Sequence, residues 1–70
     1  MVYESLKIRE TTTLTHGQFD LVCKWFELRF HKQPITDYNY FCEWVGRFES
    51  GHPETWMDSE SLRVYNKLKE

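Results

Sequence analysis

The fold is decided by residues 18–32, which read QFDLVCKWFELRFHK. Apolar residues recur in this stretch at the three- and four-residue spacing of an α-helix. Thr15 and Gln18 have the spacing of a capping box, in which each side chain bonds the backbone N–H of the other residue. The helix must end before Pro34, because proline disfavours the helical conformation of the residue that precedes it. The sequence therefore predicts a helix over residues 16–32.

A second helix is predicted over residues 37–50. Thr36 is a suitable N-cap for it, and Gly51 can adopt the left-handed conformation that ends a helix, with Pro53 soon after. Its apolar stripe has helical spacing and consists of Phe41, Trp44, Val45 and Phe48. Because the connection to the first helix is short, the two helices are expected to form an antiparallel hairpin.

The two ends of the chain carry mixed signals. Residues 5–13 alternate between apolar and polar side chains and end in threonines, which favours an extended N-terminal arm. Asp58 or Ser59 can cap a short C-terminal helix, although residues 61–68 also alternate as a strand does. The expected fold is mainly α, a helical hairpin completed by the C-terminal helix and the extended arm. The alternative is a small α+β fold, with strands 5–13 and 61–68 flanking the hairpin.

Chain length and aromatic content define the expected core. The 70 residues form one domain, 1–70, with little interior to spare. Aromatic residues make up 17% of the chain, and their large buried areas compensate for its small size. The expected core is drawn from the two helices and consists of Phe19, Val22, Cys23, Phe26, Phe30, Phe41, Trp44, Val45 and Phe48.

Charge and hydropathy exclude several classes of protein. The net charge of −2 and pI near 5.9 argue against a protein dedicated to binding phosphate backbones. The mean hydropathy is −0.68, and no apolar run approaches the roughly 18 residues of a membrane span. The first ten residues carry charges where a signal peptide is apolar. With Cys23 and Cys42 interpreted as free thiols, we expect a cytoplasmic protein.

The sequence shows no pattern typical of an enzyme or of a metalloprotein. The two cysteines and three histidines lack the closely spaced pairs of structural zinc sites. No known motif surrounds a nucleophile, and the three glycines form no phosphate-binding array. We therefore expect no catalytic residue, no metal and no cofactor.

The helix over residues 16–32 is apolar on two sides. At about 100° per residue, Leu21, Trp25 and Leu28 lie nearly opposite the core stripe. This second stripe either packs inside the domain, under the N-terminal arm and the C-terminal segment, or binds another chain. The sequence leaves both possibilities open. In an interface, Trp25 is expected to be the anchor, because large aromatic residues dominate interface energies.

These features favour protein binding without catalysis. The second stripe would contact a protein partner or another copy of the chain, giving a homodimer. The size and composition suit a small regulator or inhibitor, of the kind that phages and mobile elements carry. The alternative function is binding of single-stranded nucleic acid, with aromatic side chains on bases and basic ones on phosphates. The residues in question are Trp25, Phe26 and Phe30 for bases, and Lys24, Arg29 and Lys32 for phosphates.

Folding is expected to need neither a metal nor a disulfide. EDTA together with a thiol reductant should leave the thermal unfolding midpoint unchanged, because both cysteines act as small apolar residues. The measurement is a circular-dichroism melt with and without the two reagents. A fall of more than a few degrees would contradict the metal and thiol assignments.

Overall fold

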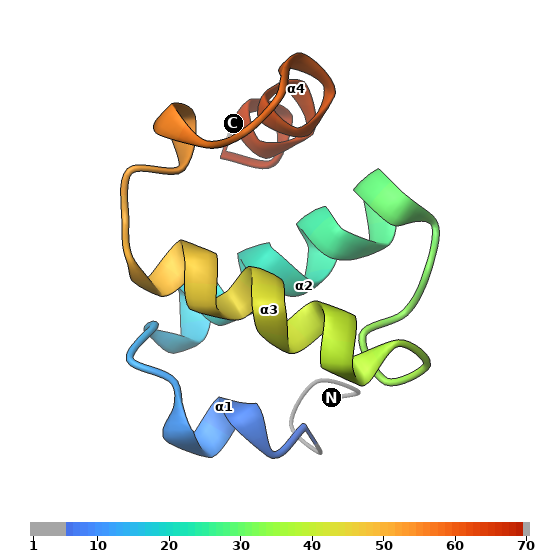
Figure 1. Cartoon of the computed structure of the whole chain (residues 1–70), viewed down its shortest axis with the longest axis vertical. Helices are drawn as coiled ribbons and strands as arrows, with labels where there is room; N and C mark the ends of the chain where they lie inside the picture. The colour runs from blue at the N-terminus through green and yellow to red at the C-terminus, as the bar shows by residue number, and fades with distance from the viewer. Residues whose placement is uncertain (1–5, 70) are drawn as a thin grey trace.

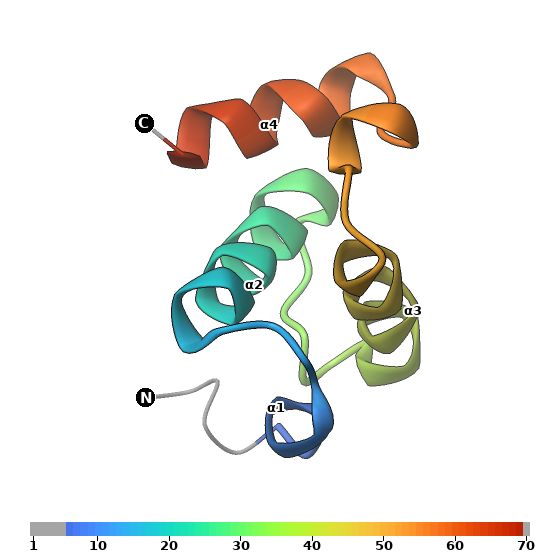
Figure 2. The ribbon, with the colours of Figure 1, turned by 90° about the vertical axis from the view of Figure 1, so that its left-hand side faces the viewer.

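The structure, a computed structural model, describes residues 6–69 as a helical domain. In chain order its elements are α1 (Ile8–Thr11), α2 (His16–Phe30), α3 (Tyr38–Glu49), the 3₁₀ turn η2 (Pro53–Thr55) and α4 (Ser59–Lys69). Helices α2 and α3 run in roughly opposite directions through the middle of the molecule (Figure 1). Helix α4 crosses α2 on one side of this pair, and α1 lies on the other side (Figure 2).

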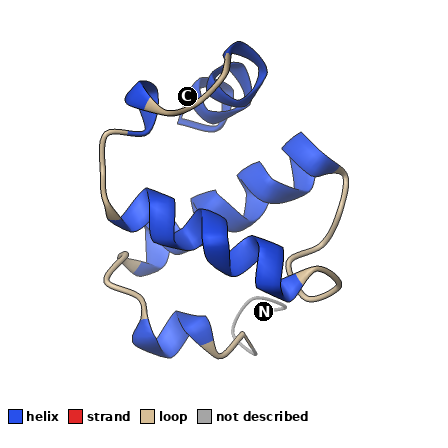
Figure 3. Cartoon of the chain, viewed as in Figure 1, coloured by secondary structure: helices blue, strands red, loops and turns tan. Residues whose placement is uncertain are grey.

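The mainly α prediction is confirmed. The described part of the chain contains helices, turns and loops but no strand (Figure 3). Residues 61–68, which the α+β alternative places in a strand, lie within α4. That alternative is therefore wrong.

Local capping signals set the boundaries of α2. Thr15 Oγ1 accepts a hydrogen bond from the Gln18 amide at 3.2 Å, and Gln18 Oε1 accepts one from the Thr15 amide at 3.2 Å. This is the predicted capping box. The helix ends at Phe30, before the predicted end at residue 32, because His31 adopts a left-handed conformation with a φ of 57°.

Helix α3 starts one position after the predicted cap. The hydroxyl of Thr36 donates to the carbonyl oxygen of Gln33 at 2.8 Å, so it stabilises the preceding turn, and Asp37 occupies the N-cap position. The prediction that Thr36 caps this helix is therefore wrong. At the other end, Gly51 has the predicted left-handed conformation, with a φ of 81°.

The prediction of an extended arm over residues 5–13 is wrong over residues 8–11, which form α1. Its first residue, Ser5, lies outside the described residues. In an extended segment Leu6 and Arg9 would point to opposite faces. In the structure both side chains pack against the domain: Leu6 is buried, and Arg9, whose side chain is 12% exposed, pairs with Asp20 at 2.9 Å. These contacts with distant parts of the chain override the local alternation of apolar and polar residues.

Most of the predicted core is confirmed. The buried apolar residues are Leu6, Phe19, Val22, Cys23, Trp25, Phe26, Phe41, Val45 and Phe48. Two predicted core residues, Phe30 and Trp44, are only partly buried and pack against the edge of this cluster. Two further buried residues were not in the predicted core: Leu6, from the predicted N-terminal arm, and Trp25, from the second stripe of the first helix. Partly buried residues of α1 and α4, among them Ile8, Val64 and Leu68, pack against this cluster and close it together with the hairpin.

Glu49, the last residue of α3, holds the segment that joins α1 to α2. Its Oε2 accepts hydrogen bonds from the Thr12 hydroxyl at 2.7 Å and from the Thr13 amide at 2.8 Å. These bonds favour the charged carboxylate, so they lower the pKa of Glu49 from its ordinary value of 4.5. The folded state therefore favours the ionised form of Glu49.

The lowered pKa of Glu49 predicts an acid-sensitive contribution to stability. A lowered pKa in the folded state means that the contribution is complete above pH 4.5 and is lost as the pH falls through the folded-state value. Glu49→Gln should lower the thermal midpoint at pH 7 and match the wild type at low pH. Glu54→Gln, at an exposed position in η2, is the matched control. Parallel melting curves for Glu49→Gln and the wild type at every pH would contradict the assignment.

Candidate functional site

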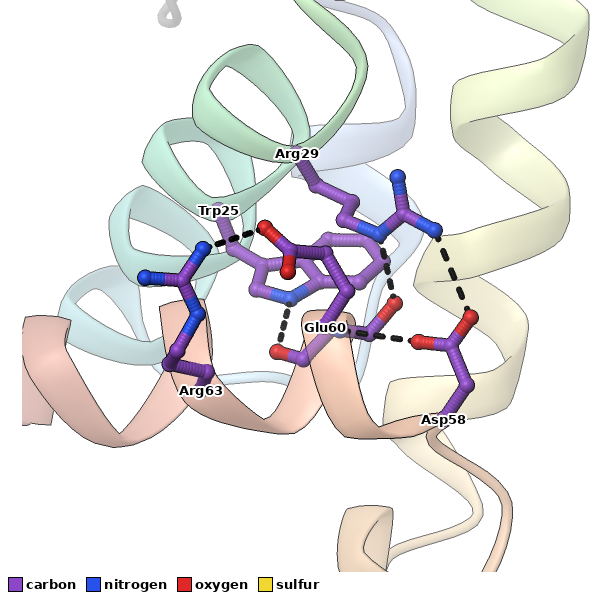
Figure 4. Close-up of polar contacts among 6 residues, drawn as sticks. Trp25, Arg29, Asp58, Glu60 and Arg63 are labelled. Carbon is purple, nitrogen blue, oxygen red and sulfur yellow. Dashed lines mark hydrogen bonds and ion pairs between the residues drawn. The ribbon is translucent and has the colours of Figure 1, made fainter.

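Trp25 lies inside the domain, where α2, α3 and α4 meet. Its side chain has no exposed surface. Its ring contacts Trp44 and Phe48 of α3, with centroid distances of 5.2 Å to each. On the other side, the indole Nε1 donates to the carbonyl oxygen of Ser61 in α4 at 3.0 Å (Figure 4). In this fold Trp25 is a core residue and not the surface anchor that the interface hypothesis requires.

The angular position of Trp25 on α2 explains its burial. At about 100° per residue, Trp25 lies only about 60° from Val22, at the border of the core stripe. Leu28 lies about 120° from Val22 and points away from the core. A large indole at the border reaches the aromatic residues of α3, and α4 covers its remaining edge. The predicted second stripe is thus divided between the core and the surface.

Three polar side chains fix the start of α4 against α2 (Figure 4). Arg29 donates from Nε to Ser61 Oγ at 2.9 Å and from Nη2 to Asp58 Oδ2 at 3.3 Å. Asp58 Oδ1 accepts from the Ser61 amide at 2.8 Å, so Asp58, one of the two N-cap candidates in the sequence, is the cap. This bond and the Ser61 side chain lower the pKa of Asp58. Every polar group of Ser61, which is only 4% exposed, therefore has a partner.

Leu28 is at the surface, beside a groove between α2 and α4. Its residue is 54% exposed, whereas Leu21 is partly buried. The groove has a volume of about 280 Å³ and is lined by Lys24, Glu27, Leu28 and Leu68. We call it the leucine groove. Of the three predicted interface residues, Leu28 alone lines it.

A second hollow opens where four segments meet. It has a volume of about 270 Å³ and lies between the end of α2, the first half of α3, the turn after η2 and the start of α4. Its lining consists of Arg29, Phe30, Tyr40, Trp44, Trp56, Met57, Asp58 and Ser61. We call it the aromatic pocket. The sequence does not predict this pocket, because no local spacing brings its residues together. The high aromatic content is the one sequence feature related to it.

The structure does not bring together the residues that the nucleic-acid alternative names. Trp25 and Phe26 are fully buried and cannot stack on bases. Arg29 is engaged with Asp58, and Lys32 pairs with Asp37 at 3.2 Å. The aromatic and basic residues of this segment therefore do not form a common face.

The cysteines are poorly placed for reactive chemistry. Burial, together with the nearby Asp20 and Glu27 carboxylates, raises the pKa of the Cys23 thiol to about 12, which favours the neutral form. Cys42 is partly buried, and both cysteines are free thiols. Among residues 6–69, no three His, Cys, Asp or Glu side chains form a group that could hold a metal ion. None of the helices in this range has both the length and the apolar character of a membrane span.

Comparisons of the chain with protein-family models, with curated proteins and with solved structures gave no match. The leucine groove and the aromatic pocket are therefore the two candidate binding surfaces of the chain.

Burial of Trp25 predicts a large loss of stability on truncation. Trp25→Ala should lower the free energy of unfolding by about 3–5 kcal/mol, because it removes a core aromatic residue. Leu28→Ala, at an exposed position of the same helix, should change it by less than about 0.5 kcal/mol. Trp25→Phe keeps a ring but loses the bond to Ser61, so its loss in the free energy of unfolding should lie between those of the other two variants. The measurement is urea unfolding followed by circular dichroism, and near-wild-type stability of Trp25→Ala would contradict the assignment of Trp25 to the core.

Proposed function

We propose that this chain is a non-catalytic protein-binding module and that the leucine groove is its contact surface. The observation that carries the proposal is the position of Leu28, which is 54% exposed beside a groove that a second leucine, Leu68, also lines. One exposed leucine is ordinary on its own, but two leucines that line one groove form a joint apolar surface, and such surfaces are where proteins meet other proteins. The aromatic Trp25, in contrast, already has its partners inside the domain.

The shape and charge of the groove favour a short apolar segment of another protein as its occupant. One lysine and one glutamate border the two leucines, so the rim has no net charge and selects neither an acidic nor a basic partner. The apolar lining suits one face of an amphipathic helix. A stable homodimer buries about 800 Å² on each copy. A single groove of this size suits a docked segment better than self-association.

Binding of this kind would serve a small regulator or inhibitor, which acts by covering part of its partner. The proposal includes the regulators that phages and mobile elements carry. We place the protein in the cytoplasm, because the free thiols of Cys23 and Cys42 suit a reducing compartment.

Leu28→Glu is expected to abolish partner binding and to leave the fold intact. The substitution puts a charge on an apolar contact surface, and the exposed position tolerates it within the domain. The control is Asn39→Glu, which adds the same charge at an exposed position of α3. The measurement compares wild type and the two variants in quantitative capture of partners from a lysate, together with thermal melts. A partner that binds all three equally would contradict the proposal.

Light scattering on the same three proteins tests the choice of occupant. A monomeric wild type is the expected result. A dimer that Leu28→Glu dissociates and Asn39→Glu leaves intact would show that a second copy, and not a different protein, occupies the groove.

A further inference from the structure

We infer that the aromatic pocket is a second binding site, which takes an aromatic side chain of an uncharged peptide segment. In this site the peptide's backbone carbonyl oxygens accept hydrogen bonds from the pocket's donors. The site is separate from the leucine groove, because Leu28 and Leu68 do not line it. It therefore extends the proposed protein binding to another surface and is testable independently.

The walls of the pocket favour an aromatic guest. Phe30 and Tyr40 meet with a centroid distance of 5.3 Å, and Tyr40 and Trp44 meet at 5.9 Å. Trp44 and Trp56 continue the row at 5.6 Å. Tyr40 is 37% exposed, so this row of rings reaches the surface. A further ring can add edge or tilted contacts of the same kind.

Hydrogen-bond donors without acceptors lie in the same walls. The indole Nε1 atoms of Trp44 and Trp56 are buried and have no hydrogen-bond partner within residues 6–69. Arg29 uses Nε and Nη2 for Ser61 and Asp58, and its Nη1 takes part in neither bond. Buried donors without acceptors are rare and unfavourable in folded proteins. Carbonyl oxygens of a guest can satisfy them once the indole rings turn towards it.

The charge and the volume of the pocket further limit which chemical groups can bind in it. Arg29 and Asp58 both line the pocket as an ion pair, so the lining has no net charge and favours neither a carboxylate nor an ammonium group. The volume of about 270 Å³ is just below the roughly 300–1,000 Å³ of most small-molecule sites. It suits one side chain with its adjacent peptide groups, which is what a protein segment presents.

The test is a titration of the ¹⁵N-labelled protein with N-acetyl-phenylalaninamide, observed through the indole N–H signals. The signals of Trp44 and Trp56 should shift saturably downfield as they gain acceptors. The signal of Trp25, already bonded to Ser61, should stay in place and serve as the internal reference. Toluene, N-acetyl-phenylalaninate and phenethylammonium are the comparison probes, and each should bind more weakly. Absence of saturable shifts, equal shifts of all three signals, or toluene binding as tightly as the amide would overturn the proposal.

Substitutions in and outside the aromatic pocket test whether the amide binds there. Arg29→Gln and Tyr40→Ala should each weaken amide binding roughly fivefold, the effect of losing one hydrogen bond or one ring contact. Arg63→Gln, which removes an exposed arginine of α4 that pairs with Glu60, should leave it unchanged. In each variant without the amide, an unchanged Trp25 indole signal confirms that α4 still packs on α2. Equal binding by Tyr40→Ala and wild type would overturn the assignment.

Leu28→Glu separates this proposal from the one on the leucine groove. That variant should bind the amide as tightly as wild type, whether or not it loses a protein partner. Loss of amide binding in Leu28→Glu would place the peptide site in the leucine groove and contradict the assignment to the aromatic pocket.

Discussion

Burial of the Trp25 side chain between three helices is the interaction on which the rest of this structure depends. The ring packs against the aromatic residues of α3, and the indole N–H bonds the first turn of α4. A short chain has few residues with which to close its core, so one large side chain shared by three helices carries much of the closure. The bonds of Arg29 and Asp58 to Ser61 then fix where α4 begins.

Both candidate surfaces follow from the way α4 crosses α2. The start of α4 supplies Asp58 and Ser61 to the aromatic pocket, and its last turn supplies Leu68 to the leucine groove. Covering Trp25 thus creates a hollow near each end of α4 while Leu28 stays exposed. At the leucine groove, stability and proposed binding use different residues of α2, Trp25 and Leu28, so substitutions in this helix can separate the two.

The sequence predicts the elements that depend on local chemistry and misses those that depend on distant contacts. The capping box of Thr15, the turn at Gly51 and the cap at Asp58 all lie where spacing and residue type place them. The sequence does not predict helix α1, because the contacts of this segment are with distant parts of the chain: Arg9 pairs with Asp20 of α2, and the Ile8 amide donates to the Tyr38 hydroxyl of α3 at 2.8 Å. For the candidate site, Leu28 follows from helical periodicity, but the burial of Trp25 depends on the direction of α4, which leaves no local signal. The aromatic pocket draws on four segments, and its unpaired indole donors appear only in three dimensions.

Hydrogen exchange of the Trp25 indole N–H is the most direct test of this central role. If α4 docks on Trp25 as an integral part of the domain, this proton should exchange only on global unfolding, as slowly as the most protected backbone amides of α2. If the indole proton exchanges rapidly while those amides stay protected, α4 detaches independently and Trp25 does not hold the three helices together.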